Sequence, residues 1–175
     1  IVVNKPVGYV STLKDPQERP VVTDLLDRIT TRVFPVGRLD YDAEGLLLLT
    51  NDGELAYRLQ HPRYKISRTY EVKIKDIPSA DELSSLRKGV RLEDGITLPA
   101  KVTLLKKAMK NCWLKITIYE GRNRQVKRMC AAIGHPVIKL KRVRFGPLSL
   151  GSLLRGQYRH IAEGEVRKLY SLVSL

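Results

Sequence analysis

The 175-residue chain has little cysteine, few aromatic residues and no long apolar run. Its apolar runs, such as residues 46–49, are far shorter than the roughly 18–20 residues that cross a bilayer, and no signal-like segment opens the chain. We therefore expect a soluble, cytoplasmic protein with no membrane partner. Cys112 and Cys130 each lie in an apolar segment, which indicates core residues rather than a disulfide scaffold or a cysteine-based metal site.

Sequence motifs for nucleotide cofactors and for metals are also missing. The chain has neither the phosphate-loop pattern that ends in Gly-Lys-Ser/Thr nor a Gly-x-Gly-x-x-Gly fingerprint. His61, His135 and His160 have no partner at the spacing of metal ligands. We therefore expect neither a cofactor nor a metal. His61 and His135 each precede a proline, which favours a turn position for both.

Acidic residues are absent from residues 121–162, which contain ten basic residues, and the whole chain has a formal net charge of +14. Residues 1–60 are slightly acidic, so the positive charge is concentrated in one part of the chain. Such an uneven positive field attracts a polyanion, of which RNA and DNA are the commonest. An anionic membrane is disfavoured because the chain has no basic helix with bulky apolar anchors. A basic protein without a polyanionic partner is the alternative that charge alone leaves open.

Length and composition favour one folded domain over residues 1–175, with two lobes. Many strand-like segments and few helical ones indicate an α+β fold, with a mixed, mostly antiparallel central sheet flanked by helices. The expected strands cover residues 1–3, 33–36, 46–50, 68–75, 101–107, 112–119 and 137–145. One helix is expected to begin at Pro20, a second to cover residues 54–60, a third to run from Ser79 to Gly89, and a fourth to end at Gly134.

The fourth expected helix combines an apolar stripe with a basic face. The stripe, at the spacing i, i+3, i+4, i+7, consists of Val126, Met129, Cys130 and Ile133. A second face carries Arg124, Lys127 and Arg128. The strand that follows presents cations on one side, namely Lys139, Lys141 or Arg142. Helix and strand together predict a basic trough.

Three carboxylates, Asp40, Asp42 and Glu44, lie between two apolar strands. Acidic residues at a strand edge commonly bond nearby backbone in turns, and we expect this role for Asp42 and Glu44. Asp40 closely follows Arg38 at the end of a strand, where a half-buried carboxylate can stay ionised as a nucleophile or base. The residues alone leave a structural and a reactive Asp40 equally open. A metal-dependent nuclease is disfavoured, because its three carboxylates would have to converge from one short loop.

Five groups of residues, in this order, resemble the motifs of ribosomal RNA pseudouridine synthases of the RsuA/RluB type. The groups are NKPVG at residues 4–8, VGRLD at 36–40 with GLLLLTNDG at 45–53, RTY at 68–70, EGRNRQVKRM at 120–129 and LKR at 140–142. The match runs from about residue 3 to residue 172. The resemblance implies that family's mixed-sheet catalytic fold and the isomerisation of uridine to pseudouridine in RNA without a cofactor.

The same resemblance implies roles for single residues. Asp40 is the expected nucleophile, Lys127 the cation paired with it, and Tyr70 the ring that stacks on the target base. Leu140 is expected to wall the base pocket, and Arg38 to help extrude the target nucleotide. The expected substrate-binding cations also include Arg124, Arg128 and Arg142. Without the motifs, Tyr70 is interpreted as a cross-strand packing residue and Lys127 as a phosphate contact. Attack at C1′ of the ribose, attack at C6 of the base and a glycal path all stay open.

The resemblance also implies a partner. The stretches DPxxRP at residues 15–20, LEDG at 92–95 and EGRNR at 120–124 are closer to the large-subunit enzymes, so we expect large-subunit (23S) ribosomal RNA, in a pre-ribosomal particle, as the substrate. We expect the enzyme to be a monomer. Such enzymes usually carry an N-terminal S4-type RNA-binding domain, whereas this sequence begins at the expected first strand of the catalytic domain. Either that domain lies upstream of this sequence or this member lacks it. The alternative is a non-catalytic rRNA-binding or ribosome-assembly protein. A carboxylate such as Asp40 disfavours it, because it would repel phosphate in a pure binding site.

Overall fold

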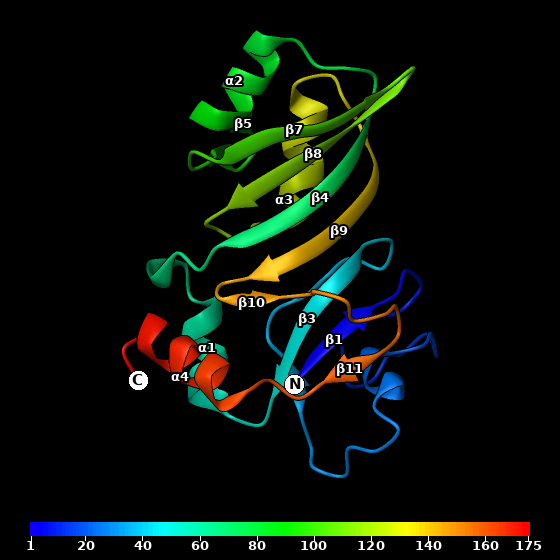
Figure 1. Cartoon of the computed structure of the whole chain (residues 1–175), viewed down its shortest axis with the longest axis vertical. Coiled ribbons are helices and arrows are strands. Elements are labelled where there is room, and N and C mark those ends of the chain that lie inside the picture. Colours follow the sequence, from blue (N-terminus) through cyan, green and yellow to red (C-terminus); the bar gives the residue numbers. More distant parts are fainter. The chain divides into compact units, whose positions relative to one another are not determined.

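The computed structural model describes all of residues 1–175 and contains two compact units. The first unit combines Ile1–Ile66 with Arg142–Leu175, and the second consists of Ser67–Lys141. The chain returns to the first unit within strand β9 (Val137–Phe145), so that the two halves of this strand belong to different units. Figure 1 labels most of the helices and strands of both.

The sheet of the first unit has the strand order β11–β1–β3–β9. Strand β1 (Val2–Lys5) pairs antiparallel with β3 (Glu44–Thr50) and with β11 (Tyr158–Arg159). The short strands β2 (Phe34–Pro35) and β10 (Leu148–Ser149) pair with β3 and β9. The other elements are the 3-10 turns η1 (Val22–Leu25) and η2 (Pro62–Tyr64) and the helices α1 (Gly53–Gln60) and α4 (Glu163–Leu172).

Strand β3 forms the centre of this unit because it is apolar along both faces, as strands covered on both sides are. Its residues 45–49 are all buried. Leu46 and Leu48 lie in one core cluster with Leu59 of α1 and Leu169 of α4. Figure 1 shows α1 and α4 side by side, and their buried leucines cover part of the strand.

The start of β3 is unusually close to its neighbours. Gly45 pairs with Lys5 of β1, and a Cβ atom at Gly45 would lie only 2.2 Å from the carbonyl oxygen of Arg142 in β9. Gly45 also has a φ of +111°, which side chains other than glycine rarely adopt. Glycine is therefore required where the acidic segment of residues 40–44 enters the sheet.

The sheet of the second unit has the order β9–β4–β8–β7. Strand β4 (Arg68–Lys75) pairs antiparallel with β8 (Asn111–Ile118), which pairs antiparallel with β7 (Lys101–Ala108). The short strands β5 (Arg91–Leu92) and β6 (Gly95–Ile96) form a separate hairpin. The helices of this unit are α2 (Ala80–Lys88) and α3 (Gln125–Ala132).

One face of this second sheet is apolar and forms the core of the unit. Tyr70, Val72 and Ile74 alternate along β4 and lie opposite buried residues of β8. Helix α3 lies behind the strands of this sheet in Figure 1, and its Cys130 is completely buried, as is Cys112 of β8. Burial raises the pKa of Cys130 to about 12, as expected for a thiol in the core.

The structure confirms the expected α+β fold with a mainly antiparallel sheet. The strands expected at residues 68–75 and 137–145 have these bounds in the structure, and residues 101–108 and 111–118 form the expected hairpin. Helix α2 has the predicted capping box between Ser79 and Glu82 and ends at Gly89. Both cysteines are buried and free, and His61 and His135 lie between regular elements, as predicted.

Two expected elements are shorter in the structure, and one helix was not predicted. The strand expected at residues 33–36 is only the two-residue β2, since Pro35 has no N–H with which to extend a ladder. The helix expected from Pro20 is the single 3-10 turn η1, where the β-branched Val21 and Val22 disfavour a longer helix. Helix α4 lies outside all predicted elements. No helix has the length and apolar character needed to span a membrane.

Candidate active site

The segment that carries Asp40 is fixed by residues of the preceding loop. The hydroxyl of Ser11 donates to the carbonyl of Leu39 at 2.9 Å and accepts from the N–H of Leu39 at 3.0 Å. The N–H of Gly8 donates to the carbonyl of Tyr41 at 2.8 Å. Hydrogen bonds thus hold the backbone immediately before and after Asp40, as a preorganised catalytic group requires.

Lys5 places a buried positive charge beside this segment. Its side chain is completely buried, and its Nζ donates to the carbonyls of Pro6 and Tyr9, each at 2.8 Å. Burial lowers the pKa of Lys5 to about 8, an effect that Asp40, Asp42 and Glu44 oppose and Arg142 reinforces. Lys5 belongs to one of the five motifs, but its sequence context indicates no role for it.

The prediction that Glu44 bonds nearby backbone in a turn is wrong. Glu44 is the first residue of β3, and its carboxylate pairs with the guanidinium of Arg155 at 2.8 Å, so it does not cap a local turn. The local turn in this segment is instead closed by backbone atoms, since the N–H of Ala43 donates to the carbonyl of Asp40 at 3.0 Å. The partner Arg155 lies far along the chain, which no local pattern could indicate.

The prediction that Arg142 is an exposed, substrate-binding cation of the basic trough is wrong. The side chain is only 2% exposed, and its Nε donates to the carbonyl of Leu46 at 2.7 Å. Its guanidinium lies 5.4 Å from the centre of the Phe145 ring. The buried Nη2 has no hydrogen-bond partner. Leu140 and Arg142 occupy alternate positions of β9 and are both buried, so the face of β9 that carries these two side chains is turned inward.

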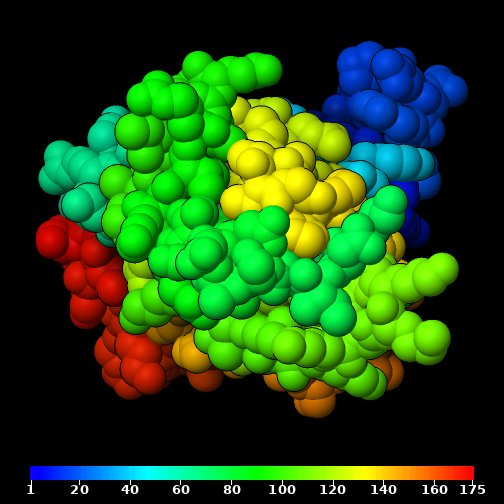
Figure 2. Space-filling model, turned by 90° about the horizontal axis from the view of Figure 1, so that it is seen from above, coloured from blue at the N-terminus to red at the C-terminus, as the bar shows by residue number.

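In the second unit, Tyr70 and Leu140 are buried and Lys127 is half-buried on α3. Tyr70 lies opposite Ile116 and is 8% exposed, on the face of the sheet against which α3 packs. Arg124 is exposed and immediately precedes α3, with a left-handed φ of 47°. Figure 2 shows the yellow surface of α3 open to solvent beside green surface of the same unit.

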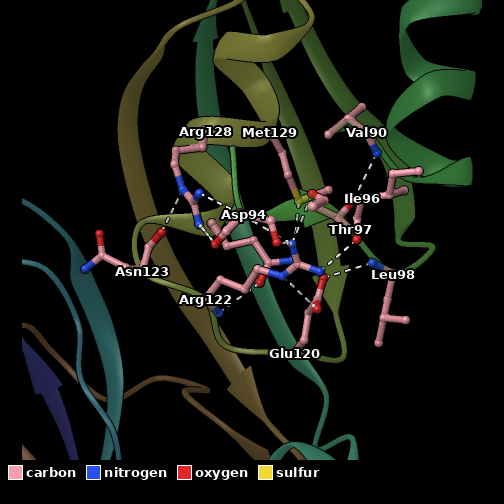
Figure 3. Close-up of polar contacts among 12 residues, drawn as sticks. Val90, Asp94, Ile96, Thr97, Leu98, Glu120, Arg122, Asn123, Arg128 and Met129 are labelled. Carbon is pink, nitrogen blue, oxygen red and sulfur yellow. Dashed lines mark hydrogen bonds and ion pairs between the residues drawn. The ribbon is translucent and has the colours of Figure 1, made fainter. Parts of the chain in front are cut away.

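Arg128 has a partner within the protein that the sequence did not indicate. Its Nη1 and Nη2 donate to the two carboxylate oxygens of Asp94 at 2.9 and 3.0 Å, and its Nε donates to the carbonyl of Asn123 at 2.9 Å (Figure 3). Asp94 lies outside the acid-free residues 121–162 and offsets one of their charges. The hydrogen bond from Arg128 lowers the pKa of Asp94, so the pair stays charged at neutral pH.

The predicted site residues are divided between the two units. The first unit contains Arg38, which is exposed, together with Asp40 and Arg142. The second contains Tyr70, Lys127, Leu140, Arg124 and Arg128. No group of three or more histidine, cysteine or acidic side chains is arranged to hold a metal ion.

Comparison with known proteins identifies the class. The sequence model of the RNA pseudouridylate synthase family matches residues 1–132, and the chain therefore belongs to this family. A crystal structure described as that of a pseudouridylate synthase has the same fold, with a TM-score of 0.84 and 34% identity over 96% of this chain and 72% of that one. The protein is thus an RNA pseudouridine synthase, an isomerase, and the non-catalytic alternative is disfavoured.

Two proteins that are named for the large ribosomal subunit are also similar to this chain. Ribosomal large subunit pseudouridine synthase B of Bacillus subtilis is 50% identical over 170 residues, which are 96% of this chain and 70% of that protein. Ribosomal large subunit pseudouridine synthase E of Xanthomonas campestris is 42% identical over 174 residues, which cover 91% of this chain and 93% of that protein.

Proposed function

We propose that this enzyme converts specific uridines of large-subunit ribosomal RNA to pseudouridine. The observation that carries the proposal is the 50% identity, over nearly the whole chain, to a synthase named for the large ribosomal subunit. The stretch LEDG at residues 92–95, which is closer to the large-subunit enzymes, supports the same assignment.

The proposed chemistry uses Asp40 and no cofactor. Uridine and pseudouridine are isomers: the N1–C1′ bond breaks, the uracil turns, a C5–C1′ bond forms, and a proton leaves C5 while N1 gains one. No electron acceptor or group donor is needed. The carboxylate of Asp40 can add to the nucleotide and depart again, or act as acid and base on a glycal. Hydrogen bonds from Ser11 and Gly8 fix the backbone on either side of Asp40 for this role.

Other residues of the two units have supporting roles in this proposal. Lys127 is the cation that we assign to Asp40 as its partner, as the motif resemblance implies. Tyr70 offers a ring for stacking on the target base, and Leu140 an apolar wall. The exposed cations Arg38 and Arg124 contact the RNA backbone around the extruded nucleotide.

Pseudouridine mapping tests the substrate. Ribosomal RNA from cells with and without this protein is compared, and the purified enzyme is incubated with large-subunit and small-subunit transcripts. We expect loss of at least one pseudouridine from large-subunit RNA only, and its restoration by the purified enzyme on the matching transcript. A missing site in small-subunit or transfer RNA, with large-subunit RNA unchanged, would contradict the proposed substrate but not the enzyme class.

A further inference from the structure

Two stretches of the sequence, residues 92–95 and 120–123, have no role in the proposed function, yet the structure joins them (Figure 3). We propose that Asp94 and Arg122 are positioning residues for Lys127. They fasten the β5–β6 hairpin to the first turn of α3, which carries Lys127. This inference rests on the role proposed above for Lys127 as the cation that partners Asp40.

The first turn of α3 depends on contacts with residues before the helix. Its N-cap, Arg124, provides no capping hydrogen bond and has a left-handed backbone, which costs free energy for any residue other than glycine. The buried side chain of Gln125 instead ties the start of the helix to the preceding loop. Its Oε1 accepts from the N–H of Arg122 at 3.1 Å, and its Nε2 donates to Glu120 at 2.8 Å. The position of this turn is therefore set by Glu120 and Arg122.

Arg122 in turn binds the hairpin. Its Nη2 donates to the carbonyl of Ile96 at 2.7 Å, and its Nη1 donates to the carbonyls of Gly95 and Asp94 at 3.1 and 3.2 Å. Its Nε donates to Glu120 at 3.0 Å. Because β5 and β6 have two residues each, the hairpin is too short to be stable without such contacts. Arg122 and the hairpin hold each other in place.

Asp94 provides a second contact between the hairpin and α3, through Arg128. Its two carboxylate oxygens bind Arg128, which is the residue directly after Lys127. Arg128 also donates to the carbonyl of Asn123, so that one guanidinium ties the helix both to the hairpin and to the loop before it. A rotation or shift of the first turn, which would move Lys127, must therefore break a bidentate ion pair. Such pairs combine strength with directional specificity.

The expected effect of loosening this network is on turnover. A displacement of about 1 Å in a catalytic group can cost about a hundredfold in rate. Asp94→Asn keeps the size of the side chain and the contacts of Arg122 with backbone carbonyls, so we expect a smaller loss, of about tenfold in kcat. The KM for RNA should change by less than this factor, because the exposed phosphate-binding cations remain.

A double-mutant cycle tests whether Asp94 acts through Lys127. Single-turnover rates at saturating RNA are measured for wild type, Asp94→Asn, Lys127→Met and the double variant. If Asp94 positions Lys127, Asp94→Asn lowers the rate about tenfold in wild type and less than about twofold in the Lys127→Met background. Arg128→Gln, which removes the same ion pair from the other side, should reproduce the loss caused by Asp94→Asn.

Glu165→Gln is the matched control, because Glu165 also forms a bidentate ion pair, with Arg159 of the first unit. It should lower the melting temperature and leave turnover unchanged. Equal rate factors for Asp94→Asn in both backgrounds, or no loss of turnover in Asp94→Asn, would overturn the positioning role alone. Unchanged turnover in Lys127→Met would instead overturn the proposed role of Lys127, and this inference with it.

Discussion

Replacement of Gly45 by alanine should strongly destabilise the first unit, although it adds only one methyl group. The new Cβ would lie 2.2 Å from the carbonyl oxygen and 2.8 Å from the nitrogen of Arg142. Both atoms belong to the backbone of β9, which cannot rotate away as a side chain would. The φ of +111° adds strain, because it lies outside the regions that side chains other than glycine favour.

The expected loss in the free energy of unfolding is the sum of two contributions, the backbone strain and the steric clash. Backbone strain of this kind costs about 1–3 kcal/mol. Forced displacement in a packed region costs about 1–3 kcal/mol more. The free energy of unfolding should therefore fall by about 2–6 kcal/mol, a large part of the total of a small protein.

Gly53→Ala is the matched control in the same unit. Gly53 begins α1, and a Cβ atom there would meet no atom within 4 Å. Because alanine restricts the unfolded chain more than glycine does, this variant should gain about 0.4–1 kcal/mol. Urea denaturation followed by far-ultraviolet circular dichroism compares the two variants. If both unfold at the same urea concentration, the described approach of β9 to Gly45 is wrong.

Two further predictions concern charge. The lowered pKa of Lys5 means that the unfolded chain binds more protons than the folded one between about pH 8 and 10.5, so the free energy of unfolding should rise over this range. Urea denaturation of wild type and Lys5→Met across this pH range should show the rise in wild type and not in the variant. The same dependence of the free energy of unfolding on pH in both proteins would refute the prediction. Neutralising the cations Arg124 and Lys141 should weaken RNA binding more than neutralising two exposed hairpin lysines, Lys106 and Lys107. The slope of log K against log salt should fall by about 0.7–0.9 for each RNA phosphate that the variant no longer binds, and equal effects of the two pairs would contradict this assignment.

The elements predicted well from sequence are those whose signals are local. Strand β4 alternates apolar and polar residues from Tyr70 to Lys75, and α2 is capped by Ser79 and ends at Gly89. Helix α4 was missed because its N-cap is Ala162, which has no side chain that could accept a hydrogen bond. Its start is instead stabilised by Glu165, which accepts from the N–H of Ala162 and pairs with Arg159.

The parts of the site that sequence reasoning missed depend on contacts between distant residues. Counting charges along residues 121–162 could not show that Asp94 neutralises Arg128, because the two lie 34 positions apart. The pattern of β9 likewise could not decide whether Arg142 faces solvent, since Lys141 and Arg142 are neighbours and one of them must face inward. Motif resemblance likewise gave no indication of which cations are already paired within the protein.

Asp40→Asn tests the central claim most directly, because it removes the carboxylate that we propose as the nucleophile while keeping the size of the side chain. The measurement is single-turnover formation of pseudouridine in a large-subunit RNA transcript, with the affinity for that RNA determined in parallel. Asp42→Asn, in the same segment, is the control and should remain active. We expect Asp40→Asn to form no pseudouridine above background and to bind RNA within a few-fold of wild type. Turnover above trace level in Asp40→Asn would contradict the assignment of Asp40 as the catalytic residue.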